Sequence, residues 1–161
     1  MKIERMEGTD AESVLSIYGE GIATRMATFE TNLPDWAQWD ANHLPAPRLV
    51  ARADDGRVAG WAALSRVSAR ACYSGVAEVS VYIAEPFRGQ GIGTALMAEL
   101  IEKAEAMGFW TLQSSIFPEN LASIKLHETF GFRIVGRRER IAQLDGLWRD
   151  TVLLERRSTI H

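Results

Sequence analysis

A glycine-rich loop that joins a predicted strand to a predicted helix constrains this chain more than any other feature of its sequence. The loop reads Arg-Gly-Gln-Gly-Ile-Gly over residues 88–93. It follows an alternating apolar stretch at 76–84 and precedes residues 91–107, whose apolar positions recur at helical spacing. Glycines allow backbone N–H groups to approach an anion, and the helix N-terminus adds the positive end of its dipole. The loop therefore predicts a ligand that carries phosphate groups.

Two common phosphate-binding motifs do not fit this loop. A P-loop ends in Gly-Lys-Ser or Gly-Lys-Thr, whereas this loop runs into Gly93-Thr94-Ala95. A dinucleotide-binding fold requires an acidic residue about 20 positions further on, but residues 110–117 read Trp-Thr-Leu-Gln-Ser-Ser-Ile-Phe. A plain glycine turn without a ligand is the alternative at this point.

The order of predicted elements excludes a regular strand–helix–strand repeat. Helices are expected at 10–22, from Pro34 to before Pro45, at 91–107 and at 120–130. Strands are expected at 2–6, 48–53, 58–64, 76–84, 110–117, 132–141 and 148–155. This order predicts one α/β (α+β) domain over residues 1–161, with a mixed, largely antiparallel central sheet flanked by about four helices.

Composition narrows the class of protein. With 161 residues, 47% of them hydrophobic and 24% charged, the chain suits one globular domain. A net charge of −3 predicts no nucleic-acid partner. The single cysteine, Cys72, cannot form an internal disulfide or a CxxC metal site, so no metal is expected. The lack of a long apolar run or a signal-like N-terminus predicts no membrane partner and a cytoplasmic location.

Two motifs together carry a family resemblance. The first is R-x-x-G-x-G at Arg88, Gly91 and Gly93, and the second is N-x-x-S-x-x-x-H-x-x-x-G-F from Asn120 to Phe132. At this separation they resemble the acyl-CoA segments of the GNAT N-acetyltransferases. The resemblance implies a GNAT-type domain with an acyl-CoA loop at 88–94 and a second cofactor segment at 120–132.

Further segments are similar to one branch of that superfamily. Residues 28–31, 69–73, 77–82 and 146–150 resemble the phosphinothricin acetyltransferases and their arsinothricin and methionine sulfoximine N-acetyltransferase relatives. The likeness covers nearly the whole chain. It implies an acyltransferase that uses acetyl-CoA as acetyl donor, acts as a homodimer, and confers resistance to a toxic amino acid analogue.

The resemblance also implies a set of cofactor contacts. Main-chain groups at the end of the strand would hold the acetyl group and pantetheine, and loop N–H groups would bind the pyrophosphate, with Arg88 adding charge. Asn120 would bond the pantetheine arm, and Ser123 lies in the same motif. The remaining main-chain contacts are expected at Val81, Tyr82, Ile83, Gly89, Gln90, Gly91, Ile92, Gly93 and Thr94.

Glu78 is the strongest candidate for a catalytic base. Side chains alternate along a strand, so Glu78, Ser80 and Tyr82 share the face opposite Val79 and Val81. A carboxylate in mid-strand is unfavourable unless it lines a cleft, and an amine that is protonated at neutral pH needs a base. The alternative is a solvated Glu78, or one paired with an arginine such as Arg70. In the resembled branch the matching Glu acts as base, directly or through water.

His127 has two possible roles. It stands where many GNAT enzymes have a Tyr that protonates the leaving thiolate, and a histidine can do the same. It can equally be a helix-face residue packed beside Phe130, and the sequence leaves both open.

Candidate substrate-binding residues lie on the predicted loops and the central strand. Arg70 is expected to hold a substrate carboxylate, although Ser68 stands where relatives often carry a cation. The full candidate set is Phe29, Glu30, Ser68, Arg70, Tyr73, Glu78 and Ser80. Structural alternatives remain: Phe29 in the core, Glu30 beside a helix and Tyr73 on the surface.

Other chemistry-bearing residues are given structural roles. Cys72 is expected to be a small buried filler, and Trp148 to pack in the final hairpin or in a dimer contact. The basic residues Arg137, Arg138 and Arg140 are predicted to form a solvated strand face, with an anion contact as the alternative.

The predicted activity is acetyl-CoA-dependent N-acetylation of the α-amino group of a small amino acid analogue, by direct transfer through a ternary complex. Candidates are phosphinothricin, arsinothricin and methionine sulfoximine or sulfone. One alternative is a peptide or protein N-terminal acetyltransferase, which needs an open groove that the tryptophan-containing segment 35–39 would cover. Another is a non-catalytic acyl-CoA sensor.

Overall fold

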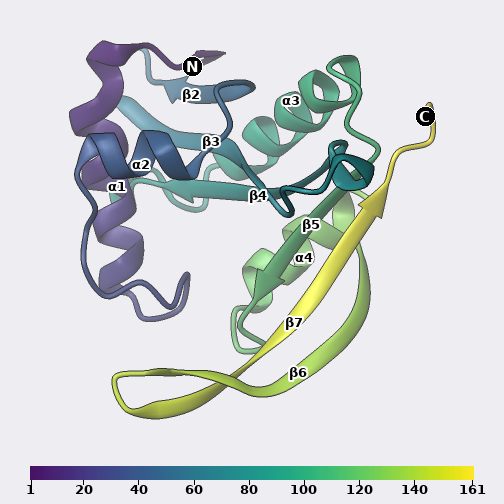
Figure 1. Ribbon diagram of the computed structural model, residues 1–161. Coiled ribbons are helices and arrows are strands. Elements are labelled where there is room, and N and C mark those ends of the chain that lie inside the picture. The colour runs from purple at the N-terminus through teal and green to yellow at the C-terminus, as the bar shows by residue number, and fades with distance from the viewer.

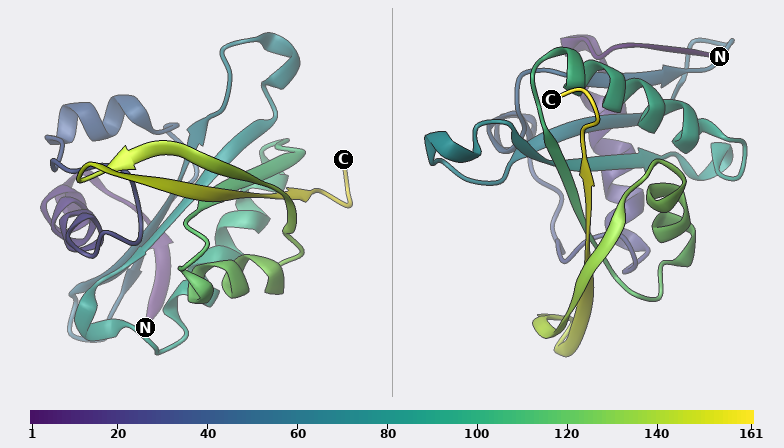
Figure 2. Two further views of the ribbon diagram at one scale, coloured as in Figure 1. Left: turned by 90° about the horizontal axis from the view of Figure 1, so that it is seen from below. Right: turned by 90° about the vertical axis from the view of Figure 1, so that its right-hand side faces the viewer.

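In the computed structural model, which describes residues 1–161, a single twisted sheet separates two layers of helices (Figures 1 and 2). Helices α1 (Ala11–Ala23) and α2 (Trp36–Asn42) cover one face, and α3 (Ile92–Ala106) and α4 (Leu121–Thr129) cover the other. The strands are β1 (Lys2–Arg5), β2 (Arg48–Arg52), β3 (Val58–Arg66), β4 (Val76–Ile83), β5 (Thr111–Ile116), β6 (Arg133–Leu144) and β7 (Leu147–Arg157). They are arranged in the order β1-β2-β3-β4-β5-β7-β6.

The predicted fold class and element order are confirmed. Every strand pair is antiparallel except β4 with β5. The largest boundary difference is in the final hairpin, whose strands extend to Leu144 and from Leu147. They are joined by Asp145 and Gly146, with φ of 52° and 77°, the conformation that a tight two-residue hairpin turn requires.

Each face of the sheet has its own core. Under α3 the packing is aliphatic, built around residues such as Leu64, Leu96 and Leu100. Under α1 and α2 it is aromatic, with Trp39 and Trp61 both fully buried. The alternation of strand side chains sends Trp61 to this second face together with its cross-strand partner Tyr82.

The single parallel pair sets the position of the site. β4 and β5 pair only from Val76 to Glu78 against Thr111 to Gln113, although both strands continue further. Beyond Glu78 the strands diverge, so the main chain of residues 79–83 has no strand partner on the β5 side. This opening leads to the glycine loop before α3.

No helix of the structure combines the length and apolarity needed to cross a membrane.

Candidate active site

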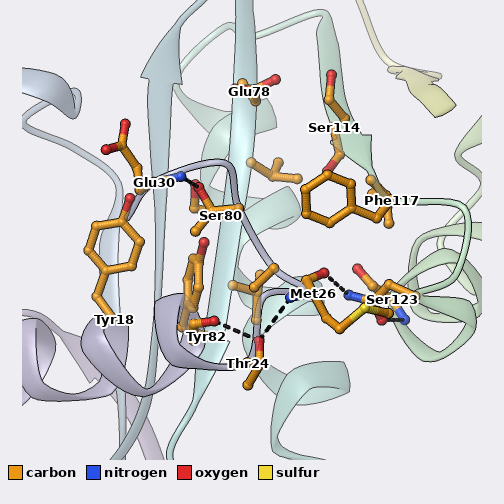
Figure 3. A pocket seen from close by; sticks show the side chains of 18 of the residues that line it. Tyr18, Thr24, Met26, Glu30, Glu78, Ser80, Tyr82, Ser114, Phe117 and Ser123 are labelled. Carbon is orange, nitrogen blue, oxygen red and sulfur yellow. Dashed lines mark hydrogen bonds between the residues drawn. The ribbon is translucent and has the colours of Figure 1, made fainter. Parts of the chain in front are cut away.

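A cavity of about 1210 Å³ opens where β4 and β5 separate. Its walls come from the C-terminal half of α1, the loop that follows, α2, the glycine loop, α4, and the β6–β7 hairpin (Figure 3). This volume exceeds the range of roughly 300–1,000 Å³ that is usual for a single small ligand. It is large enough for two substrates side by side.

Most of the candidate residues line this cavity. They are Phe29, Glu30, Glu78, Ser80, Val81, Tyr82, Ile83, Arg88, Gly89, Gly91, Gly93, Thr94, Asn120, Ser123 and His127. Five others do not: Ser68, Arg70, Tyr73, Gln90 and Ile92.

The glycine loop has the geometry of an anion site. Gly89 and Gly91 have φ of 77° and 80°, and an added Cβ at either would meet nothing within 4 Å, so backbone conformation rather than crowding favours glycine. Gly91 is the N-cap of α3 and offers no side-chain acceptor, which leaves the first-turn N–H groups free for a ligand. The side chain of Gln90 bonds the Pro86 carbonyl at 3.3 Å, and Ile92 is buried in the core. Any ligand contact at these two residues is therefore through the main chain.

Asn120 is already engaged within the chain. Its Oδ1 accepts the Ser123 N–H at 3.2 Å and caps α4, and its Nδ2 donates to the Met26 carbonyl at 3.1 Å. Asn120 therefore joins the second cofactor segment to the loop after α1. One Nδ2 proton is left for a pantetheine arm.

Glu78 points into the cavity from β4, as Figure 3 shows. Burial raises the pKa of its carboxyl, and a hydrogen bond from Gln113 and the positive charge of Arg138 lower it in part. A carboxylate with a raised pKa in a cleft has the character of a general base.

His127 has the geometry of a neutral, packed histidine. It is only 5% exposed, lies edge-on to Phe132 at 4.9 Å, and holds Nδ1 2.7 Å from the Ser123 carbonyl oxygen. That oxygen only accepts, so Nδ1 carries the proton and Nε2 has the lone pair when the ring is neutral. Burial lowers the pKa of His127. Both features favour the packing alternative over a proton donor.

The segment that carries Ser68, Arg70 and Tyr73 projects away from the cavity. It connects β3 to β4 and stands out from the sheet in both views of Figure 2. The Arg70 guanidinium lies 5.7 Å from the Tyr73 ring centroid, on the exposed surface. Within one chain, the structure does not bring Arg70 to Glu78. Cys72 in the same segment is exposed, so the prediction of a buried filler is wrong.

Several residues that line the cavity are not among those predicted from the sequence. Arg138 of β6 is exposed, as a solvated strand face predicts, but it also lines the cavity, where the alternative of an anion contact stays open, and its positive charge acts on Glu78. Gln38, Asn42 and His43 line the cavity from the end of α2. No local signal identifies them, because only the packing of α2 against the sheet brings them there.

Two tyrosines complete the wall beside Glu30. The Tyr18 ring points toward Glu30 in Figure 3, and burial together with the Glu30 charge raises the Tyr18 pKa. Burial also raises the pKa of Tyr82 well above its ordinary value. Its ring lies so close to α1 that a Cβ on Gly21 would be 2.6 Å away, which explains a glycine inside that helix. Both hydroxyls therefore stay protonated at neutral pH.

Comparison with known proteins decides the family. The family model described as Acetyltransferase (GNAT) family matches residues 19–132, which include the glycine loop and the Asn120 segment. The chain belongs to the GNAT acetyltransferase family. This GNAT protein is an acetyltransferase, and its relatives confirm the resemblance to the phosphinothricin acetyltransferase-like branch.

Curated relatives match it along almost their full length. A Bacillus subtilis (strain 168) protein, named provisionally as a phosphinothricin acetyltransferase, is 36% identical, with 97% of this chain and 98% of that protein covered. The L-methionine sulfoximine/L-methionine sulfone acetyltransferase of Pseudomonas paraeruginosa (strain DSM 24068 / PA7) is 32% identical, with 91% and 88% covered.

Solved structures share the fold. The phosphinothricin acetyltransferase of Sinorhizobium meliloti in complex with AcCoA superimposes with a TM-score of 0.89 at 29% identity, covering 99% of this chain and 91% of that one. A ribosomal-protein-alanine N-acetyltransferase of Brucella melitensis superimposes with a TM-score of 0.90 at 31% identity, covering 98% and 100%. Fold similarity alone therefore does not separate small-molecule from protein acetylation.

Proposed function

We propose that this GNAT protein transfers the acetyl group of acetyl-CoA to the α-amino group of a small amino acid analogue. Phosphinothricin, arsinothricin and methionine sulfoximine or sulfone are the candidate class. The observation that carries the proposal is the half-buried Glu78 carboxylate, which faces the cavity where β4 and β5 separate. One cavity with room for both substrates supports direct transfer in a ternary complex.

The residues on the cofactor side fit acetyl-CoA. On the side that faces β5, the main chain of residues 79–83 provides donors and acceptors for the pantetheine amides, and the N-terminus of α3 provides N–H groups for the pyrophosphate. Arg88, the first residue of the glycine loop, lines the cavity and adds positive charge. When bound, acetyl-CoA supplies the activated thioester.

The residues on the substrate side fit an amino acid. Glu78 takes a proton from the substrate ammonium, directly or through water, because a protonated amine has no lone pair for attack. Arg138 is the cationic side chain that acts on Glu78 inside the cavity, so we assign it to the substrate carboxylate. In this assignment it replaces Arg70 of the same chain. Arg70 reaches a site only if a second chain places it there.

We do not assign His127 as the donor that protonates the departing thiolate. Its Nδ1–H is directed at the Ser123 carbonyl and its neutral Nε2 is an acceptor. His127 instead packs α4 against Phe132.

A peptide or protein N-terminal acetyltransferase is the second candidate, favoured by the Brucella melitensis structural neighbour. Helix α2 argues against it, because Gln38, Trp39 and Asn42 form part of the cavity wall and narrow the space for a polypeptide. A non-catalytic acyl-CoA sensor is the third candidate, and it gives no role to a carboxylate that is half-buried in the cavity at Glu78.

Thiol release from acetyl-CoA tests the proposal. The panel holds phosphinothricin, arsinothricin, methionine sulfoximine, methionine sulfone, ordinary amino acids and short peptides. We expect turnover on the analogues, and a kcat/KM lower by about 10²- to 10⁴-fold in Glu78→Gln. Glu102→Gln is the matched control, because Glu102 lies on the exposed side of α3, outside the cavity.

The other outcomes support one of the alternative functions or remove Glu78 from the mechanism. Turnover confined to peptides supports the N-terminal acetyltransferase. Tight acetyl-CoA binding with no turnover on any amine supports the sensor. Full activity in Glu78→Gln removes the assigned base.

A further inference from the structure

One lobe of the cavity has no role in the chemistry described so far. It lies on the α2 side of Glu78 and is lined by Gln38, Asn42 and His43 from α2 and its end, and by Ser65 of β3. Ser65 is the cross-strand partner of Glu78, so the lobe begins directly beside the assigned base. In the proposed function, the thioester of acetyl-CoA occupies the cofactor side of the cavity. The substrate carboxylate lies at Arg138. The lobe is therefore where the side chain of an amino acid substrate extends.

His43 is held rigidly in this lobe. Its ring stacks on Trp39, with centroids 4.0 Å apart and planes at 21°, and it meets Trp61 edge-on at 5.8 Å. Its Nδ1 lies 2.6 Å from the Trp39 carbonyl oxygen. That oxygen only accepts hydrogen bonds, so Nδ1 carries the proton. No group in the chain bonds Nε2, which keeps its lone pair while the ring is neutral.

The surroundings keep the ring neutral. Burial and the positive charge of Arg48 lower the His43 pKa, outweighing the Trp39 carbonyl and the Asp40 carboxylate, which raise it. Arg48 is bound to Asp40 at 2.6 Å and lies over the Trp39 ring, so the cation is fixed close to His43. His43 therefore presents an acceptor to the lobe, not a donor.

Asn42 provides the complementary group. The Asn42 Oδ1 accepts a hydrogen bond from Gln38 Nε2 at 3.1 Å. Because Oδ1 faces Gln38, the Asn42 Nδ2 group points away from Gln38 and is left as a donor. The lobe thus offers an acceptor at His43 Nε2 and a donor at Asn42 Nδ2, beside the Gln38 amide oxygen, which accepts, and the Ser65 hydroxyl, which can do either. A substrate group with an N–H and an oxygen on the same centre matches both.

We infer that His43 Nε2 is a specificity-determining acceptor that selects amino acid analogues with a hydrogen-bond donor at the end of their side chain. This inference rests on the proposed function and narrows its substrate class. Methionine sulfoximine carries an N–H where methionine sulfone carries a second oxygen, and the two are otherwise the same size. A sulfone oxygen or an ionised phosphinate oxygen would face the Nε2 lone pair without a proton between them, which is unfavourable.

The experiment compares the two analogues at saturating acetyl-CoA. We expect wild type to favour methionine sulfoximine over methionine sulfone in kcat/KM by about tenfold, the scale of one hydrogen bond, and to place phosphinothricin below sulfoximine. In His43→Asn an amide N–H can still reach the Trp39 carbonyl but nothing reaches the Nε2 position. The ratio should fall to about one, mainly through a lower kcat/KM for sulfoximine.

Two further variants make the test specific. His43→Gln places an amide oxygen near the Nε2 position, so it should recover part of the ratio. His161→Asn is the matched control, because His161 also bonds a backbone carbonyl, that of Glu105 at 2.7 Å, but lies outside the cavity. The ratio of kcat/KM for sulfoximine to kcat/KM for sulfone should be the same in His161→Asn as in wild type.

Calorimetric binding of both analogues in the presence of CoA gives a readout independent of turnover. Equal affinities in wild type, a preference for phosphinothricin, or an unchanged ratio in a folded His43→Asn would each overturn the role of His43. These results leave the proposed function standing if both analogues are acetylated. Absence of turnover by folded wild type on every analogue overturns the proposed function instead, and the binding ratio still decides whether His43 selects for a donor.

Discussion

At the scale of a residue, Glu78 combines a functional gain with a cost in stability. Its pKa is raised in the folded state, so between its unfolded and folded pKa values the folded protein binds more protons. Stability contributed by this group is therefore present at low pH and lost as pH rises through the folded pKa.

We predict that Glu78→Gln melts about 2–4 °C higher than wild type at pH ~7.5 while losing activity. Melting curves at pH ~4 should show the difference shrinking, because both side chains are then neutral. A Glu78→Gln protein that is less stable at pH ~7.5 would contradict the desolvation argument.

The same residue sets the low-pH limb of activity. If Glu78 is the base, kcat/KM falls as pH drops through its raised pKa. Gln113 donates a hydrogen bond that lowers this pKa. Gln113→Leu should therefore move the limb to higher pH, by up to about one unit. A pH–rate profile measures this, and an unshifted limb would assign it to another group.

At the scale of an element, the loop between α1 and α2 is held by contacts from distant parts of the chain. The Arg149 guanidinium of β7 donates to the Arg25 carbonyl at 3.2 Å and lies 4.0 Å from the Phe117 ring centroid. Phe117 in turn packs edge-on against Phe29 at 4.9 Å. Arg149→Met keeps apolar contact with Phe117 but loses the donors. We predict a KM for the amino acid higher by about fivefold, a kcat within about twofold, and about 1 kcal/mol less stability.

Steady-state kinetics and denaturant unfolding check this prediction. Arg133→Met is the control, since Arg133 forms an exposed ion pair with Glu155 far along β7, where such pairs contribute little. An equal rise in KM in both variants would mean that the loop does not depend on Arg149.

At the scale of the whole molecule, the β6–β7 hairpin leaves an apolar surface uncovered. β6 is the edge strand of the sheet and is exposed along most of its length. The exposed apolar side chains on the hairpin are Ile134, Val135, Ile141, Leu147 and Trp148. Exposed apolar side chains on an unpaired edge strand favour a second copy of the chain. We predict a homodimer by light scattering, and dissociation by Trp148→Glu with little change in the far-UV spectrum; a wild-type monomer would refute it.

A dimer also offers a way for Arg70 to act, since it lies outside its own cavity. If Arg70 serves the partner's site, mixing inactive Arg70→Ala and Glu78→Gln dimers should restore about a quarter of wild-type activity, because each mixed dimer then has one complete site. No recovery after subunit exchange would exclude action across the interface.

The fold class, the order of elements and the glycine loop before α3 could be predicted from the amino-acid sequence alone. These follow from local rules: strand alternation, helical spacing, and glycines at Gly91 and Gly146 where φ is positive. Glu78 was identifiable for the same reason, because a carboxylate on one face of an apolar strand is a local anomaly.

The residues that we propose for the substrate side could not be located without the three-dimensional packing of the chain. The divergence of β4 from β5 brings α2, β6 and the loop after α1 around Glu78, from segments tens of residues apart. That packing placed Arg138 and His43 in the cavity and left Arg70 outside it. It also made His43 and His127 neutral acceptors at Nε2, since His43 is half-buried, His127 is buried, and each directs Nδ1 at a carbonyl oxygen one helical turn earlier. Protonation and proximity depend on burial and on neighbours distant in the chain, and local patterns carry no information about either.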